Sequence, residues 1–254
     1  MELQDALARD AMVLFTGSKF FQGPPFSGAV FVPPSIMSKL RGVTKADVRL
    51  MRPFMSHFFT SHDFPPELRP SFGATVPSLA NRGLALRWHA VLPEMERFFQ
   101  ELNVQGACLY ISRITEQWGT GVEAALEDMP AIDKFERHGS ILNVTVRKPD
   151  GALCTTEELR TMYGWLSSDM MGELSAAGAA LTDGEAEVCR SRVLLGQPVK
   201  VADEFGVLRF ALSAFDTRTM ADKKGLAATL EDDHRALTKL QLCADHFPAL
   251  VRQG

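Results

Sequence analysis

The chain has 254 residues and a formal net charge of −4, and hydrophobic residues make up 46% of it. This length and composition allow one large domain or two modest ones with a substantial core. The acidic balance gives no electrostatic footprint for nucleic acid or anionic membrane, and no apolar run approaches the roughly 20 residues of a membrane span. We therefore expect no nucleic-acid partner and no membrane partner.

Four cysteines, Cys108, Cys154, Cys189 and Cys243, stand far apart without a C-x-x-C pair. The first residues include Glu2 and Asp5 and lack the character of a signal peptide. The sequence therefore predicts a reduced, cytoplasmic protein.

Residues 12–34 read M-V-L-F-T-G-S-K-F-F-Q-G-P-P-F-S-G-A-V-F-V-P-P. The pattern predicts a strand over 12–15, a turn over 16–19 and a second strand over 29–32. Phe20 and Phe21 follow Lys19, so we expect this lysine to lie partly out of water, which would favour the nucleophilic, neutral amine. The alternative is a lysine that buries its stem and keeps its ammonium in solvent.

The order Thr16-Gly17-polar-Lys19, then Gly-Pro, then a further glycine before an apolar strand resembles the lysine segment of fold type I enzymes that use pyridoxal 5'-phosphate (PLP). The similarity is greatest to the class V aminotransferase group, which includes cysteine desulfurases and kynureninase. The chain departs from that group at three positions. Gln22 is an extra residue, Ser18 replaces the usual histidine, and Phe26 stands where a glycine is common.

The resemblance implies that Lys19 forms a Schiff base with PLP and later moves a proton. It also implies that Thr16 and Ser18 contact the cofactor phosphate, and that the loop with Gly23 and Pro24 lies near the phosphate site of the other subunit in a homodimer. No metal is implied.

A second segment, L-L-G-Q-P-V followed after a gap by V-L-R-F-A-L-S-A-F-D-T, resembles the arginine segment of the desulfurases. It implies that Arg209 binds the α-carboxylate of an amino-acid-type substrate. The alternative is an arginine at the end of an edge strand, paired with Asp203 or Glu204. Leu195 stands where a desulfurase has its nucleophilic cysteine, which argues against persulfide chemistry, and Cys189 is expected to be a packed core residue.

Only 18 residues precede Lys19, so the chain is similar to the C-terminal portion of a fold type I subunit. We expect an α/β protein in which residues 1–100 are the remainder of the PLP-binding large domain and residues 101–254 form an α/β small domain. Two functions follow as hypotheses. The first is a PLP-dependent transferase or lyase, N-terminally incomplete, and the second is a non-catalytic homologue or fragment that acts as a dimerisation or interaction module.

Between the two motifs, the sequence predicts a helix over 35–42 and, because of its prolines, mostly loop over 51–79. His57, His62 and Asp63 in that segment invite a metal site, but a binding loop is favoured because His residues five apart do not share a helical face. A helix over 81–99, capped within 78–81 and kinked or restarted at Pro93, should precede another over 111–129.

The C-terminal part carries alternation typical of a strand over 141–147 and a helix start at T-T-E-E, residues 155–158. The tail from 222 to 251 is expected to be helical, with Asp232, Asp233, Lys239 and Asp245 on its solvent side.

Overall fold

The computed structural model describes residues 3–72, 76–102, 104–201, 204–221 and 223–251. It is a mixed α/β protein with two antiparallel sheets, one of two strands and one of four. The chain divides into two compact units, Met1–Arg97 and Phe98–Gly254, and each is described by itself below. The sequence placed its boundary at residue 100.

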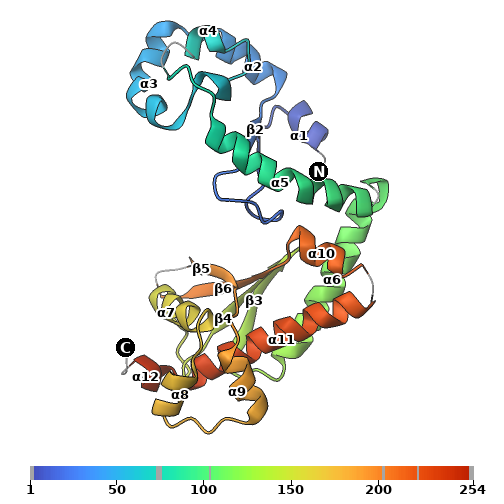
Figure 1. The fold of residues 1–254 in the computed structure, drawn as a ribbon, viewed down its shortest axis with the longest axis vertical. Coiled ribbons are helices and arrows are strands. Elements are labelled where there is room, and N and C mark those ends of the chain that lie inside the picture. Colours follow the sequence, from blue (N-terminus) through green and yellow to red (C-terminus); the bar gives the residue numbers. More distant parts are fainter. Residues whose placement is uncertain (1–2, 73–75, 103, 202–203, 222, 252–254) are drawn as a thin grey trace. The chain divides into compact units, whose positions relative to one another are not determined.

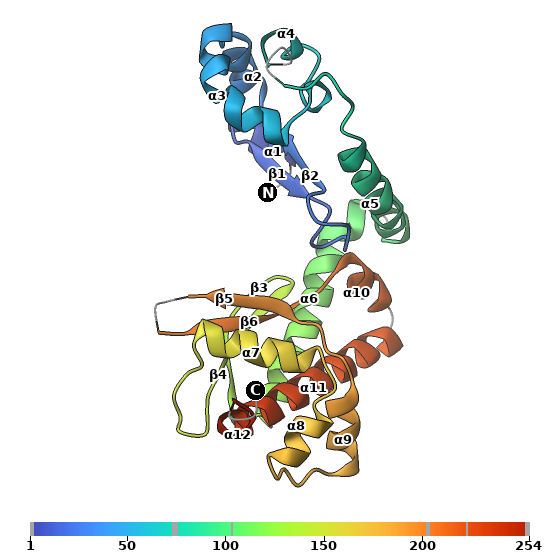
Figure 2. The same ribbon diagram turned by 60° about the vertical axis from the view of Figure 1, so that its left-hand side comes forward.

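The first unit begins with a short helix and a two-stranded ribbon (Figure 2). The strands pair in antiparallel register, Val13 opposite Phe31 and Thr16 opposite Gly28. Each strand begins and ends one residue away from the expected bounds, so the ribbon confirms the predicted pair. The bounds are α1 Leu3–Ala8, β1 Val13–Thr16 and β2 Gly28–Phe31.

Helix α2 (Pro34–Arg41) confirms the helix predicted over 35–42, and further helices follow where mostly loop was expected. The prediction for residues 51–79 was wrong because Pro53 lies inside a 14-residue helix that begins at a capping box. The Thr44 side chain accepts a hydrogen bond from Asp47 N, and the Asp47 carboxylate accepts one from Thr44 N. Buried Val48 and Met55 anchor a small apolar cluster here. The other bounds are α3 Lys45–Phe58, the 3₁₀ turn η1 Ser61–Asp63 and α4 Arg69–Phe72.

Helix α5 (Arg82–Glu101) starts at the expected cap and runs through Pro93 without interruption. Asn81 caps it, because its Oδ1 accepts a hydrogen bond of 3.0 Å from Leu84 N. The same side chain donates through Nδ2 to both carboxylate oxygens of Asp63, at 3.2 Å each. The cap therefore fastens the start of α5 to η1.

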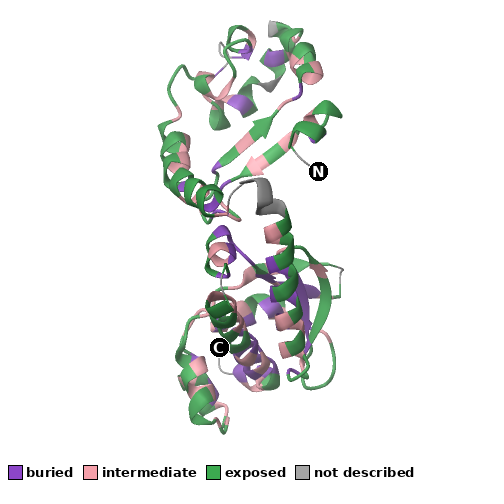
Figure 3. Ribbon diagram, turned by 90° about the vertical axis from the view of Figure 1, so that its right-hand side faces the viewer, coloured by how far each residue is buried: buried purple, intermediate pink, exposed green. Residues whose placement is uncertain are grey.

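The second unit is a two-layer α/β arrangement. Its sheet has the order β3-β4-β6-β5 with every neighbouring pair antiparallel, and helices α6, α7 and α11 form a layer on one face (Figure 1). Figure 3 shows the buried positions along this sheet and the helix faces next to it. The bounds are α6 Val104–Leu126, β3 Ile132–His138, β4 Ile141–Val146, α7 Thr156–Leu166, β5 Gly196–Lys200, β6 Gly206–Ala211 and α11 Lys223–Asp245.

Alternation along the two inner strands explains which face is buried. Leu142 and Val144 on β4 stand opposite Phe210 and Leu208 on β6, and all four are almost completely buried under the helices. The predicted strand β4 and the predicted start of α7, where Thr155 and Glu158 form a capping box, are both confirmed. The remaining helices are α8 Met171–Ala176, α9 Asp183–Arg190, α10 Ala214–Thr219 and α12 Phe247–Val251.

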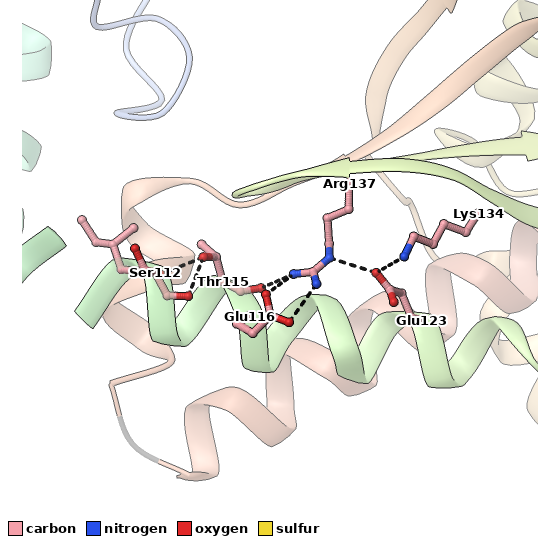
Figure 4. Close-up of polar contacts among 7 residues, drawn as sticks. Ser112, Thr115, Glu116, Glu123, Lys134 and Arg137 are labelled. Carbon is pink, nitrogen blue, oxygen red and sulfur yellow. Dashed lines mark hydrogen bonds and ion pairs between the residues drawn. The ribbon is translucent and has the colours of Figure 1, made fainter. Parts of the chain in front are cut away.

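Strand β3 was not predicted, because it reads I-D-K-F-E-R-H and looks like a charged surface segment. Arg137 instead reaches the helix layer, where its guanidinium forks onto Glu116 at 2.9 and 3.0 Å and its Nε meets Glu123 Oε1 at 2.9 Å (Figure 4). Lys134 Nζ shares Glu123 Oε1 at 2.8 Å. The two positive charges on this strand are therefore neutralised by partners on α6 that are distant in sequence.

Helix α11 corrects one expectation about its solvent side. Asp232 and Asp245 are exposed as predicted, but Lys239 is completely buried. Its ammonium donates to the carbonyl oxygens of Leu166, Ser168 and Ser191 at 3.1, 2.6 and 2.5 Å.

Asp233 is also mostly buried and accepts a hydrogen bond of 2.7 Å from Trp118 Nε1. Burial raises the pKa of its carboxyl to about 6. The spacing of the apolar residues predicted which face of α11 packs on the core, but it did not predict that Lys239 and most of Asp233 would be buried as well.

Candidate functional site

The turn between β1 and β2 brings together the residues that sequence analysis assigned to the cofactor. Thr16 ends β1, and its Oγ1 lies 2.8 Å from Ser18 Oγ and accepts a hydrogen bond of 3.2 Å from Ser18 N. Gln22 N donates to Lys19 O at 2.9 Å and closes the turn after the lysine. Two hydroxyls and one primary amine therefore occupy a single short turn.

Close packing against the Val91 side chain of α5 explains the two glycines of this turn. Gly17 N donates to Ser27 O at 2.8 Å and Gly23 N donates to Gly17 O at 2.9 Å, so both strands of the loop are held together. A Cβ at Gly23 would lie 2.0 Å from Val91 Cγ2 and 2.8 Å from Gly17 O. A Cβ at Gly17 would lie 2.6 Å from a Val91 methyl, so neither position has room for a larger residue.

Lys19 is exposed, and the expectation that it lies partly out of water was wrong. Phe21 is the residue that turns inward. It is 7% exposed, and its ring lies 6.3 Å from that of Phe15, which in turn stacks on Trp88 at 5.9 Å. Phe21 therefore packs inward on Phe15, which contacts Trp88 of α5, while Lys19 stays exposed, as a snorkelling lysine would.

Two departures from the family pattern have a structural counterpart in this loop. Gln22, the extra residue after the lysine, and Phe26, which stands where a glycine is common, have φ angles of 52° and 66°. Both fall in the left-handed region that favours glycine. The backbone at residue 26 thus takes the conformation for which the glycine of the pattern is suited.

Arg209 lies in the middle of β6, an inner strand of the second unit, and not at the end of an edge strand. Its register partners are Asn143 on β4 and Gly196 on β5. Arg209 Nη2 donates to Gln197 O at 3.3 Å, while its Nε is buried and makes no hydrogen bond within the described part of the chain. The structure gives Arg209 no ion pair with Glu204, and Asp203 lies outside the described residues.

The neighbour Asn143 adds a second unsatisfied atom on the same side of the sheet. Its Nδ2 donates to Glu136 Oε1 at 3.1 Å, but its buried Oδ1 has no hydrogen-bond partner among the described residues. Gly196 packs closely against Arg209, since a Cβ there would lie 2.9 Å from Arg209 Cβ and 3.5 Å from its Nε. The unused guanidinium donor can bind a carboxylate oxygen of a ligand, and the amide oxygen next to it can accept a hydrogen bond from an N–H group of the same ligand.

The candidate residues thus fall into two groups. Thr16, Ser18, Lys19 and Gly23 share one turn of the first unit, whereas Arg209 belongs to the second unit.

The cysteines that the structure describes do not provide a nucleophile. Cys154, Cys189 and Cys243 are free and buried. Burial raises the pKa of the Cys154 thiol to about 12 and also raises the pKa of the Cys189 and Cys243 thiols. Leu195 packs against the core of the second unit. Cys189 is therefore the packed core residue that the sequence predicted.

The residues considered for a metal site have other roles. Asp63 accepts hydrogen bonds from Thr60 and Asn81, and His57 and His62 are exposed. Across the described ranges, we find no group of three or more histidine, cysteine or acidic side chains arranged to hold a metal ion. Within those same ranges, no helix has the length and apolar character needed to cross a bilayer.

Sequence analysis missed a large groove within the first unit, of about 1390 Å³. The ribbon β1–β2, helix α2, the end of α3, the segment through η1 and α4, and the start of α5 form its walls. None of Thr16, Ser18, Lys19 and Gly23 lines it. No local pattern could have revealed it, because its walls come from residues 14 to 88.

Comparison of the chain with known protein families, with curated proteins and with solved structures finds no match.

Proposed function

We propose that the chain is the C-terminal part of a PLP-dependent enzyme of the class V aminotransferase type, acting on an amino-acid-type substrate as a transferase or lyase. In this proposal the first unit is the remainder of the large domain and the second is the small domain. The protein would be a cytoplasmic homodimer. The observation that carries the proposal is the turn after β1, which presents two hydroxyls and an exposed lysine, and in which the packing of Val91 leaves no room for a side chain at Gly17 or Gly23.

The donor set of the turn fits the cofactor. PLP, when bound, supplies an electron sink for cleavage of a bond at the substrate α-carbon. The hydroxyls of Thr16 and Ser18 can donate hydrogen bonds to phosphate oxygens, and Lys19 Nζ is accessible for a covalent bond to the cofactor aldehyde carbon. Lys19 Nζ would then hold and return the proton that moves during the reaction.

Arg209 would bind the substrate carboxylate. Its unused Nε, together with the neighbouring orphan acceptor on Asn143, supports a ligand-binding role over a purely structural one. The positive φ of Phe26 adds support from the backbone, since the resembled pattern has a glycine there. Gly23 and Pro24 would face the phosphate site of the second subunit.

The second candidate is a non-catalytic homologue that acts as a dimerisation or interaction module. The ribbon favours it. Leu14 and Val30 stand opposite each other in register and are 81% and 52% exposed, so one face of a two-stranded sheet presents apolar side chains to solvent. Isolated ribbons of this kind are only marginally stable in water, and further strands or another chain would cover them.

Cofactor absorbance separates the two candidates. The purified chain is mixed with PLP, and the visible band of lysine-bound cofactor is compared between the wild type, Lys19→Ala and a matched variant, Lys39→Ala, at an exposed lysine of α2. The catalytic proposal expects a band in the wild type and in Lys39→Ala, and none in Lys19→Ala. A folded wild type without the band would favour the interaction module.

A test of Arg209 uses the amino-acid-induced change of the same band. Arg209→Ala should retain cofactor uptake and show a weakened response to added amino acids. Equal loss of both responses would assign Arg209 a structural role.

A further inference from the structure

We propose that the groove of the first unit binds a soluble, single-chain amphiphile with an anionic head, such as an alkyl carboxylate. The inference is independent of PLP chemistry, because the groove is lined by none of the residues assigned to the cofactor. It rests on the volume of the groove, on the apolar character of its walls and on the charges at its polar end.

The volume and walls indicate an apolar ligand. The groove, at about 1390 Å³, exceeds the roughly 300–1,000 Å³ of common small-molecule pockets. Several of its apolar side chains are open to solvent, among them Leu14, Phe26 and Phe58 at 81, 83 and 65% exposure. An exposed apolar surface of this kind marks a binding site in a folded protein, and a flexible alkyl chain can follow apolar walls that come from several separate elements.

The charges select the head group. The lining includes two arginines, Arg69 and Arg87, and a single carboxylate, Asp63. The hydrogen bonds from Thr60 and Asn81 already satisfy Asp63. Arg87 is half-buried on α5 and has no acidic partner in the described part of the chain, while Arg69 uses its Nε for Phe64 O at 3.1 Å. The two arginines outnumber the one carboxylate, so the charged side chains of the lining sum to a positive charge, which complements an anion.

The head group and chain can be tested on the whole chain without variants. A fluorescent fatty acid is titrated below its micelle concentration and displaced with alkyl carboxylates, the matching alcohols and alkyl trimethylammonium ions. We expect affinity to rise by up to about fourfold for each added methylene buried. The carboxylate should bind more tightly than the alcohol, and the ammonium ion most weakly. Equal affinity for the three head groups, or no dependence on chain length, would overturn the proposal.

A matched pair of variants locates the head group. Arg87→Gln removes the half-buried cation of the groove, and Arg82→Gln changes an exposed arginine of the same helix that does not line it. We expect Arg87→Gln to weaken carboxylate binding by about tenfold, the ratio that corresponds to one charge-assisted contact, while Arg82→Gln binds as the wild type does.

Equal affinities in the two variants, with circular dichroism unchanged, would refute the assignment. Concentration-dependent dimers that abolish fatty-acid binding would show a second copy in the groove, and binding to anionic vesicles alone would show a membrane surface. Either result would also overturn it.

Discussion

Replacing Lys239 with methionine should destabilise the second unit strongly, although the residue was expected on a solvent-facing side. The ammonium is completely buried and donates to three carbonyl oxygens, those of Leu166, Ser168 and Ser191. These oxygens belong to the C-terminal ends of α7 and α9 and the segment after α7. Lys239 therefore connects three backbone segments to α11 through a single charged group.

The size of the expected loss in the free energy of unfolding follows from the carbonyl oxygens that lose their hydrogen-bond donor. Leu166 O also accepts from Val193 N at 2.8 Å and keeps that partner. The oxygens of Ser168 and Ser191 have no other donor within the described residues. Both hydrogen bonds are only part-buried and Ser191 is exposed, so water replaces some of what is lost, and each hydrogen bond to the charged ammonium contributes about 1.5–3 kcal/mol. Burial lowers the pKa of Lys239, so removal of the charge recovers part of that cost. We expect a net loss of about 3 kcal/mol in the free energy of unfolding.

Urea unfolding followed by circular dichroism measures this loss. Methionine keeps most of the volume of the lysine stem, so the comparison isolates the ammonium. Lys224→Met, at an exposed lysine of the same helix, is the control and should unfold with the wild type. A Lys239→Met variant within about 0.5 kcal/mol of the wild type would refute the role of the buried ammonium.

Three further changes test other parts of the structure. Asp233→Asn should stabilise the chain above pH 6 by about 2–3 kcal/mol, because burial raises the pKa of Asp233 from 3.8 to about 6. The stability that the protonated wild-type carboxyl contributes is therefore fully present below pH 3.8 and is lost as the pH rises through 6. A stability difference between Asp233→Asn and the wild type that does not change with pH in urea titrations would contradict this pH dependence. Arg137→Lys should lower the melting temperature, because lysine cannot make the two parallel hydrogen bonds to the Glu116 carboxylate. The difference in melting temperature should shrink at about 1 M salt, and a difference that does not depend on salt would argue against the ion pairs. Gly23→Ala should cost about 1–3 kcal/mol by its overlap with neighbouring atoms, whereas Gly28→Ala, whose nearest neighbour is Phe15 O at 3.8 Å, should cost less; equal losses in urea would remove the steric explanation.

Elements with strong local signals were predicted well. The start of α7 is set by Thr155 and Glu158, which form a capping box within four residues, and β4 by the plain alternation of its apolar side chains. In contrast, α3 was hidden by Pro53. The capping box at Thr44 and Asp47 lies in the sequence, and attention to it could have found the helix.

Other features depend on partners that are distant along the chain. Strand β3 was missed because its charged residues look like a surface segment. Arg137 and Lys134 pair with Glu116 and Glu123 of α6, and no local pattern contains that information. The order of residues placed Thr16, Ser18, Lys19 and Gly23 in one turn, but the exposure of Lys19 was decided by where Phe21 packs. The grouping of these residues in one turn was therefore predictable, whereas the exposure of Lys19 was not.

The central claim, that Lys19 is the residue that bonds to PLP, is tested most directly by chemical trapping. The wild-type chain is incubated with PLP, reduced with borohydride, digested and mapped by mass spectrometry at several cofactor concentrations. We expect the peptide with Lys19 to carry the reduced cofactor at the lowest concentration, ahead of every other lysine peptide. Labelling spread evenly over the exposed lysines, with the Lys19 peptide no more modified than that of Lys39, would contradict it.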